Sequence, residues 1–361
     1  MRYRADQVGS LLRPPQLIEA RTAYMEGRLD QDALRAVEDQ AILDILEEQR
    51  QSGIEVFTDG EYRRYNFYSD LIDAVDGFVT TDEVPLLWRG GNPAHSPGRV
   101  VGAKLQQKRR LTEHEVPFLK AHAPWPIKVT VPTANQLLRS YQVGITDRFY
   151  PTRADLAQEL IGIVRRELEA LIADGVPYIQ IDAPGYAALV DQEGRERLRQ
   201  SGVDPDQALD EAIGADNATV AGLKQEGVTI ALHLCRGNSR SRWLSEGSYE
   251  PIAEKLFNGL KVDRLLLEYD SERAGGFEPL HFMPRDKEVV LGLITTKEGQ
   301  LEAEGDLLRR IDEAARYVEM EQLAISPQCG FASAMLGNLL SMDDQRRKLE
   351  LVSDIARKAW G

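Results

Sequence analysis

Both cysteines of this 361-residue chain lie where they could bind a metal ion. Cys235 follows His233 by two residues in "ALHLCRGNSR", and the apolar run before this pair predicts a buried strand. Because alternate side chains of a strand point to the same face, we expect the imidazole and the thiol to lie together at its carboxyl end. Cys329, in "SPQCGF", also follows an apolar run. One nitrogen and two sulfur ligands are typical of zinc sites.

Further polar residues follow the other predicted strands. They are Ser10, Asp59, Glu61, Asp182, Glu268, Asp270 and Lys297. Charged side chains at the end of an apolar strand are usually paired or metal-bound, and Glu268 is a candidate fourth zinc ligand. The alternative for each is a satisfied buried polar group or a helix N-cap, and a buried cysteine can act as a small apolar residue. Three protein ligands and one exchangeable position indicate catalytic zinc.

The elements that must position these residues alternate along the chain. Apolar segments predict strands at 7–11, 55–60, 127–132, 178–184, 228–235, 264–270, 288–294 and 322–330. The clearest helix is predicted at 153–175, where apolar residues recur at three- and four-residue spacings before Gly175. Strands separated by helices favour a parallel sheet, and eight of them predict an α/β fold with a single (β/α)8 TIM barrel over residues 1–361. Active sites of such barrels lie at the carboxyl ends of the strands.

Residues 75–125 interrupt this alternation with a segment rich in Pro and Gly. We expect an irregular insertion over the barrel mouth, with no more than a short hairpin in it. Long insertions usually serve a site or an interface. The insertion would therefore either cover a ligand bound at the barrel mouth, with Trp88 and Trp125 excluding water, or form a contact between subunits.

Composition narrows the class of protein. The formal net charge of −14 disfavours a nucleic-acid partner, which would require a basic surface. No apolar run approaches the roughly 20 residues that span a membrane, and "MRYRADQVGS" lacks the apolar core of a signal peptide. Two cysteines provide no disulfide framework, so we expect a cytoplasmic protein. The oligomeric state is left open.

The motifs "QVGSLLRP", "TDGEYRR", "IQIDAP", "HLCRGN", "LLLEYD" and "SPQCGFAS" resemble the catalytic domain of cobalamin-independent methionine synthase, and most closely its short single-barrel relatives. The resemblance covers nearly the whole chain and keeps the order of the strands. It implies a zinc-dependent enzyme that methylates homocysteine to methionine. Residue by residue, it implies that the zinc ligands are His233, Cys235, Glu268 and Cys329, with a water as the alternative to Glu268.

The same resemblance implies a homocysteine site. Gly9 and Ser10 match the turn that binds the substrate carboxylate, and Glu61 and Asp182 match the acids that hold its amino group. Zinc would lower the pKa of the substrate thiol, so that a thiolate forms at neutral pH and displaces the methyl group from its donor.

Departures from the family pattern concern the donor. The family's "IDEP" reads "IDAP" here, and the acid that grips the pterin falls near Ala188. No Trp in "TVPTANQLLRS" matches the pterin-stacking Trp, and Lys297 stands where the family has a proton-donating His. The homocysteine side is retained and the folate side is largely absent. The methyl donor is therefore left open between a folate and a corrinoid.

The predicted zinc site is also compatible with two other functions. A related zinc enzyme could join an alkyl group or an epoxide to another thiol, as in the epoxyalkane–coenzyme M transferase branch. Homocysteine carries an ammonium group that Glu61 and Asp182 would pair with, whereas these carboxylates would repel the sulfonate of coenzyme M. The second alternative is a zinc-binding or regulatory barrel that catalyses no reaction. Such a protein would not need a substrate pocket lined by acids.

Overall fold

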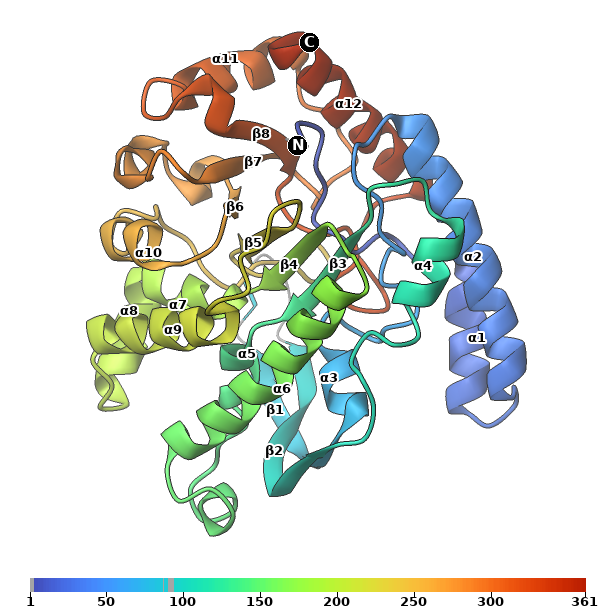
Figure 1. Cartoon of the computed structure of the whole chain (residues 1–361), viewed down its shortest axis with the longest axis vertical. Coiled ribbons are helices and arrows are strands. Elements are labelled where there is room, and N and C mark those ends of the chain that lie inside the picture. Colours follow the sequence, from blue (N-terminus) through green and yellow to red (C-terminus); the bar gives the residue numbers. More distant parts are fainter. Residues whose placement is uncertain (1–2, 87, 90–93) are drawn as a thin grey trace.

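The computed structural model describes residues 3–86, 88–89 and 94–361. Six parallel strands form the central sheet in sequential order, and helices surround it (Figure 1). The strands are β3 (Lys128–Pro132), β4 (Tyr178–Asp182), β5 (Thr229–Leu234), β6 (Arg264–Glu268), β7 (Glu288–Ile294) and β8 (Leu323–Pro327). Nearly every strand residue is buried, which explains why their sequences read as continuous apolar runs rather than as alternating patterns. The predicted α/β class with a parallel sheet is confirmed.

The helices pack against the sheet through apolar stripes. Their bounds are α1 (Pro15–Met25), α2 (Gln31–Ser52), α3 (Ser69–Ala74), α4 (Val116–His122), α5 (Ala134–Leu138), α6 (Arg153–Ala173), α7 (Ala187–Val190), α8 (Gln192–Gln200), α9 (Pro205–Val220), α10 (Ala253–Gly259), α11 (Glu304–Ala314) and α12 (Met342–Trp360). In α6, the capping box of Thr152 and Asp155 satisfies free amide groups at the first turn. The chain leaves α6 at Gly175, which has a φ of 78° that favours glycine. The helix predicted at 153–175 is therefore confirmed.

Isolated parallel bridges continue the sheet at both of its edges. Ala5 pairs with Ile325 of β8, and Phe57 pairs with Ile127 just before β3. The two edge segments also meet, because the amide of Glu55 donates a hydrogen bond to the carbonyl of Ala5 at 3.1 Å. Backbone hydrogen bonds therefore connect the β8 edge to the β3 edge through the segments around residues 5 and 55–57.

The strands predicted at 7–11 and 55–60 are not formed as regular strands. The reason is local backbone geometry at the end of each segment. Gly9 has a φ of 138°, Gly60 of 69° and Glu61 of 59°, and none of these values allows a β-ladder to continue. Each segment therefore makes only an isolated bridge and then turns away from the sheet.

A buried ionic cluster ties the N-terminal segment to the amino end of the sheet. Asp6 contacts Nζ of Lys128 at 2.7 Å and Nη1 of Arg264 at 3.0 Å, and it accepts a hydrogen bond from the hydroxyl of Tyr178 at 2.7 Å. The three partners are the first residues of β3, β6 and β4. Burial alone would raise the pKa of Asp6, but the two cations lower it below the ordinary value. The segment that precedes Gly9 is thereby held in place.

The insertion at 75–125 is more regular than expected. It contains a long antiparallel hairpin, β1 (Val75–Leu86) and β2 (Ala94–Gln107), followed by α4. The many Val and Thr residues favour strands, and both strands of a two-stranded ribbon have a free edge that tolerates Pro85 and Pro97. Figure 1 shows the hairpin projecting from the sheet beside α3. The prediction of an irregular insertion is therefore wrong for most of its length.

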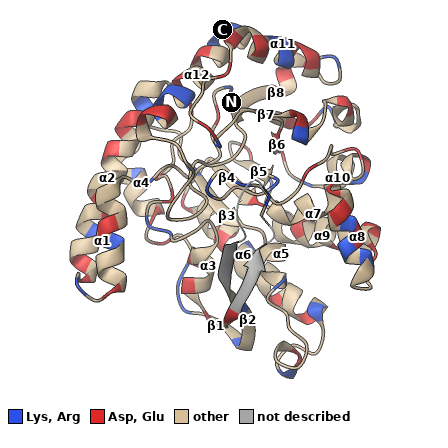
Figure 2. Cartoon of the chain, turned by 180° about the vertical axis from the view of Figure 1, so that it is seen from behind, with Lys and Arg blue, Asp and Glu red and all other residues tan. Residues whose placement is uncertain are grey.

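Acidic and basic residues are interspersed along the outer helices, for example on α8 and α12 (Figure 2). Many of them form ion pairs within one helix, such as Arg346 with Asp343 and Glu350 on α12. Among the described helices, none combines the length and the apolar character needed to cross a bilayer.

Candidate metal centre

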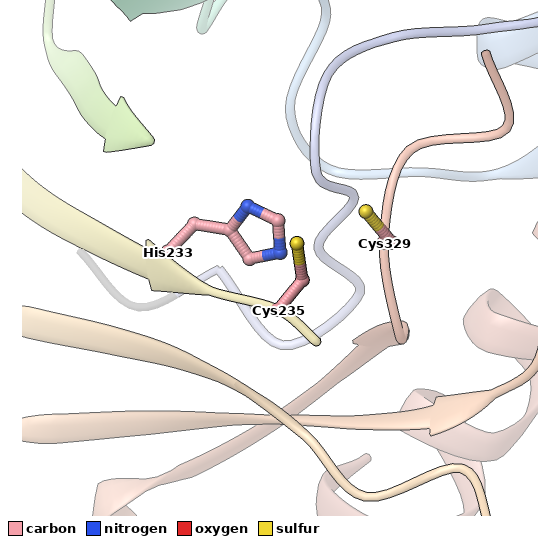
Figure 3. Close-up of side chains that lie close together, drawn as sticks. All are labelled: His233, Cys235 and Cys329. Atoms are coloured by element: carbon pink, nitrogen blue, oxygen red, sulfur yellow. The ribbon is translucent and has the colours of Figure 1, made fainter. Parts of the chain in front are cut away.

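His233, Cys235 and Cys329 meet at the carboxyl end of the sheet. His233 lies within β5, Cys235 directly follows that strand, and Cys329 lies on the loop that follows β8 (Figure 3). One potential ligand atom of each residue lies within 4.8 Å of the other two. Residues almost 100 positions apart are thus brought together because parallel strands present their carboxyl ends at the same edge.

A hydrogen bond at one nitrogen orients the ring of His233, and the other nitrogen is available to bind a metal ion. Its Nδ1 lies 3.0 Å from Oδ1 of Asp182, the last residue of the neighbouring strand β4. Its Nε2 is buried and has no hydrogen-bond partner among the described residues. Burial favours the neutral ring, but Asp182 and the nearby sulfur of Cys329 raise the pKa of His233 to about 10. A buried nitrogen without a partner is what a metal ligand looks like before the metal binds.

The two thiols differ in their affinity for a proton. Interaction with Cys235 and the positive charge of His233 lower the pKa of Cys329 well below the ordinary value, despite its burial. Interaction with Cys329, together with burial, raises the pKa of Cys235. The three residues therefore compete for protons, and a cation that displaces these protons would satisfy all three. The nitrogen and two sulfurs fit zinc.

Glu268 lies beside these three residues, but its carboxylate oxygens are not within 4.8 Å of all three ligand atoms. It ends β6, where the pairing of Leu234 with Leu267 places it opposite Cys235. Its Oε2 accepts a hydrogen bond from the amide of Arg236 at 2.7 Å, and its Oε1 accepts one from Nη2 of Arg273 at 2.6 Å. Burial raises the pKa of Glu268, while the charge of Lys297 opposes this rise. In this arrangement both carboxylate oxygens are already hydrogen-bonded.

Lys297 follows β7 at the border of the same cluster and is partly buried. Its Nζ donates a hydrogen bond to Oδ1 of Asn238 at 3.2 Å, and the amide of Asn338 donates to the same oxygen at 2.9 Å. Its positive charge acts on both Glu268 and Cys329. The alternative of an exposed lysine that opens a helix does not describe this position.

Glu61 presents a carboxylate oxygen without a partner. Its Oε1 accepts a hydrogen bond from the hydroxyl of Thr130 at 2.7 Å and lies 3.5 Å from Nη1 of Arg64. Its Oε2 is buried and has no hydrogen-bond partner among the described residues. Burial raises the pKa of Glu61 to about 7, Arg64 opposes this rise, and the charge of Asp182 adds to it. Glu61 and Asp182 therefore lie close enough to interact, and a cation between them would stabilise both.

Backbone strain at Glu61 accompanies this arrangement. Its φ of 59° is a conformation that residues other than Gly and Asn rarely adopt. Such conformations persist where surrounding contacts over-determine them, which is common at functional sites. Here Arg13 contributes by donating a hydrogen bond to the carbonyl of Glu61 at 2.7 Å.

Gly9 and Ser10 line the same region. A Cβ on Gly9 would lie 2.6 Å from Cγ2 of Thr130, so this position requires glycine. Ser10 lies against the loop that carries Cys329, since a Cβ on Gly330 would be only 1.9 Å from the Ser10 hydroxyl. The carbonyl of Ser10 accepts a hydrogen bond from the amide of Phe331 at 2.8 Å. The predicted carboxylate turn is therefore brought next to the cysteine loop.

Several residues of the site were missed by sequence reasoning. Thr130 and Arg64 position Glu61, and Arg273 holds Glu268. Thr130 lies on a predicted strand and Arg64 lies in the quoted motif "TDGEYRR", so the position of each in the sequence could have indicated that it lies near the site. Arg273 carried none, because it lies in a polar loop after β6.

The tip of the hairpin approaches the loop after β5. Arg89 forms a backbone bridge with Trp243, and its side chain lies 3.1 Å from Oδ2 of Asp191. The side chain of Arg242 lies over the ring of Trp88 at 5.6 Å. This part of the insertion therefore reaches the carboxyl end of the sheet. Trp125 precedes β3 and lies at the amino end of the sheet, so it is not placed to cover a ligand bound beside the two cysteines at the carboxyl end.

Comparisons with known proteins agree with these observations. Residues 5–357 match the family model described as cobalamin-independent synthase, catalytic domain. Uncharacterized protein YxjH of Bacillus subtilis is 38% identical over 99% of this chain and 95% of its own length. A methionine synthase of Sulfolobus acidocaldarius is 24% identical over 90% of this chain and 84% of its own length.

Two solved structures share the fold. One is described as a putative vitamin-B12 independent methionine synthase from Listeria monocytogenes, with 28% identity, a TM-score of 0.76 and coverage of 99% of this chain and 98% of that one. The other, a B12-independent methionine synthase from Shewanella in complex with selenomethionine, has 22% identity, a TM-score of 0.77 and coverage of 99% and 98%. The chain belongs to the family of the cobalamin-independent methionine synthase catalytic domain, a family of methionine synthase-type methyltransferases.

Proposed function

We propose that this protein is a zinc-dependent methyltransferase that methylates the thiol of homocysteine to form methionine. The observation that carries the proposal is the unpartnered Nε2 of His233 beside two cysteine sulfurs, at the edge of a pair of interacting carboxylates. When bound, zinc would lower the pKa of the substrate thiol and hold it as a thiolate. The protein's own residues would bind the rest of the substrate.

The charges around the cluster suit an amino acid. The free Oε2 of Glu61 and the carboxylate of Asp182 would pair with the ammonium group of homocysteine. The backbone amide groups at Gly9 and Ser10 and the hydroxyl of Ser10 would donate hydrogen bonds to its carboxylate. A thiol that carries a sulfonate and no cation would be repelled by the same two acids. The site therefore favours homocysteine over coenzyme M.

We propose that the methyl donor differs from the usual polyglutamylated folate. Ala183 and Ala188 replace acids that would read the edge of a pterin, and residues 128–140 contain no aromatic side chain to stack on it. A methylated corrinoid or corrinoid protein is the donor class that we propose instead. Comparing methionine formation from methyltetrahydrofolate and from methylcobalamin tests this point, and rapid turnover with the folate would contradict it.

We also propose that the chain forms one cytoplasmic domain with a closed (β/α)8 barrel. The bridges at Ala5 and Phe57, together with the hydrogen bond from Glu55 to Ala5, support closure between β8 and β3. Both cysteines are free thiols, which suits a reducing compartment.

The decisive experiment measures metal content and substrate binding together. We expect about one zinc ion per chain in the wild-type protein and a large loss in Cys235→Ser, because a thiolate ligand is removed. His281→Gln is the control, since His281 is exposed and belongs to neither group of possible metal ligands in the described part of the chain. Homocysteine should raise the melting temperature of the zinc-loaded protein, and coenzyme M should not. Full zinc retention in Cys235→Ser would refute the proposal.

A further inference from the structure

The hydroxyl of Thr130 connects Arg64 to the carboxylate of Glu61, and the chemistry of these groups fixes the direction of both hydrogen bonds. Nη1 of Arg64 lies 2.9 Å from Oγ1 of Thr130, and that oxygen lies 2.7 Å from Oε1 of Glu61. A guanidinium only donates hydrogen bonds, and a hydroxyl has a single proton. Thr130 therefore accepts from Arg64 and donates its proton to Glu61, so that Oε1 is occupied as an acceptor.

Arg64 is held too firmly to leave this hydroxyl and pair directly with Glu61. Its Nε and Nη2 donate hydrogen bonds to the two carboxylate oxygens of Glu115 at 2.7 and 2.6 Å, and its Nε lies 2.5 Å from Oδ2 of Asp70. Its Nη2 also donates to the backbone carbonyl of Thr130 at 2.9 Å. Two buried carboxylates and one carbonyl therefore fix the plane of the guanidinium. Its Nη1 stays 3.5 Å from Oε1 of Glu61, which is longer than an ordinary hydrogen bond.

The side chain of Thr130 is itself fixed by packing. Its methyl carbon Cγ2 faces Gly9, where an added Cβ would lie only 2.6 Å away. Thr130 is buried, and the close approach of the Gly9 backbone leaves the hydroxyl on the side of Arg64 and Glu61. Thr130 thus connects the turn proposed to bind the substrate carboxylate with the acid proposed to bind its amino group.

One oxygen of Glu61 is left for a ligand. Oε1 accepts the proton of Thr130, whereas Oε2 is buried and has no hydrogen-bond partner among the described residues. The charged groups that face this carboxylate are Arg64 and Arg13, which favour its ionised form, and Asp182, which opposes it. A buried carboxylate oxygen without a partner is costly unless a cation or a proton binds to it.

Resting on the homocysteine site proposed above, we propose that Thr130 is a positioning residue that makes Oε2 the single oxygen of Glu61 open to the ammonium group of an α-amino acid. A proton taken up by Glu61 would bind to the same oxygen, so the proton and the ammonium group compete for one atom. The hydrogen bond from Thr130 stabilises the ionised carboxylate, which extends the binding of the ammonium group to lower pH. Thr130 thereby favours an amino-acid thiol over a thiol that lacks the amino group.

The test measures the dissociation constant of methionine by calorimetry on the zinc-loaded protein between pH 5.5 and pH 8.5. Thr130→Val keeps the shape of the side chain and removes the hydroxyl. Because Oε1 then loses its donor, we expect the pH below which methionine binding weakens to rise by about one unit. The dissociation constant at pH 6 should be about tenfold higher than in the wild type, and the two constants should converge above pH 8. A purely structural defect would instead weaken binding equally at every pH.

Three further variants serve as controls. Thr130→Ser restores a hydroxyl and should keep the wild-type pH profile. Thr133→Val is the matched control, because Thr133 follows the same strand and also donates a hydrogen bond to a buried carboxylate, that of Asp216, and it should leave the pH profile of methionine binding unchanged. Thr130→Ala also lacks the hydroxyl and should shift the profile in the same direction as Thr130→Val, so it tests the inference if that variant does not fold.

The possible failures can be told apart. A zinc-loaded wild-type protein that binds no methionine at any pH would overturn the homocysteine site and this inference with it. A wild type that binds methionine, with the pH profiles of Thr130→Val and Thr130→Ala unchanged, would overturn the inference alone. A shift to lower pH in either variant would also overturn it, because it would mean that Arg64 pairs directly with Glu61 once the hydroxyl is removed.

Discussion

Nδ1 of His233 lies 3.0 Å from Oδ1 of Asp182, its direct neighbour in the pairing of β5 with β4. The nitrogen donates and the carboxylate accepts, so the other ring nitrogen faces the cysteines without a proton once a metal is bound. Oδ1 of Asp182 also accepts a hydrogen bond from Nε2 of Gln180 at 2.9 Å, which holds the carboxylate in place. Asp182 therefore orients the histidine in addition to its proposed contact with the substrate.

Asp182→Asn should weaken the binding of both zinc and homocysteine. The variant removes the charge that stabilises His233 and one of the two partners of the substrate ammonium, so each dissociation constant should rise by about tenfold or more. Chelator competition and calorimetry measure the two constants. Asp216→Asn, which alters another buried carboxylate, is the control. Unchanged zinc affinity in Asp182→Asn would mean that the hydrogen bond to His233 has no role in metal binding.

Ligand binding at Glu61 should depend on pH. Because burial raises the pKa of Glu61 to about 7, its carboxylate is protonated below that pH and cannot pair with an ammonium group. Methionine has the same ammonium and carboxylate groups as homocysteine but no thiol to titrate. Its dissociation constant should be lowest above pH 7 and rise by up to about tenfold per unit of pH below it. Glu61→Gln should bind weakly at all pH values, and an unchanged pH dependence in this variant would contradict the assignment.

Lys297→Met should lower turnover without releasing zinc. The lysine is partly buried, hydrogen-bonded to Asn238, and its charge acts on Glu268 and Cys329. Removing a positioned cation from a buried anionic site should reduce kcat by about tenfold to a hundredfold. Lys297→Arg should recover part of the activity. Lys224→Met, at an exposed lysine on the outside of the molecule, is the control, and equal turnover in both Met variants would exclude a role for Lys297.

Asp216 should make the stability of the protein pH-dependent. Burial raises its pKa to about 6, although Thr133, Asn135 and Tyr186 donate hydrogen bonds to it. The folded state binds the proton more tightly than the unfolded state, so this contribution is complete below the unfolded pKa of about 3.9 and is lost as the pH rises to about 6. The loss amounts to about 3 kcal/mol, since one pKa unit corresponds to about 1.4 kcal/mol.

Denaturant unfolding between pH 4 and pH 7 measures this effect. The free energy of unfolding of the wild type should fall relative to that of Asp216→Asn from pH 4 to pH 6 and then stay level. Asp210→Asn alters an exposed residue of the same helix and should follow the wild type. A constant difference between the wild type and Asp216→Asn across this range would show that Asp216 keeps an ordinary pKa.

The main elements could be predicted because they depend on local patterns. The helix at α6 follows from the spacing of its buried residues and from its capping box. The strands β3–β8 follow from continuous apolar runs. The length of the hairpin at residues 75–107 exceeds the short hairpin that was expected, because its Pro and Gly residues are typical of loops. Only the free edges of a two-stranded ribbon make them compatible with strands.

The sequence by itself determined which residues could form the metal centre, since His233 and Cys235 are two residues apart at the end of one apolar run and Cys329 follows another. Only the tertiary structure decided how the surrounding groups are paired. Asp182 reaches His233 because β4 and β5 are in register, and Glu268 is bound by Arg273 because the loop after β6 folds back over it. Such pairings depend on strand register and on packing between distant segments, and side-chain periodicity along one segment carries no information about either.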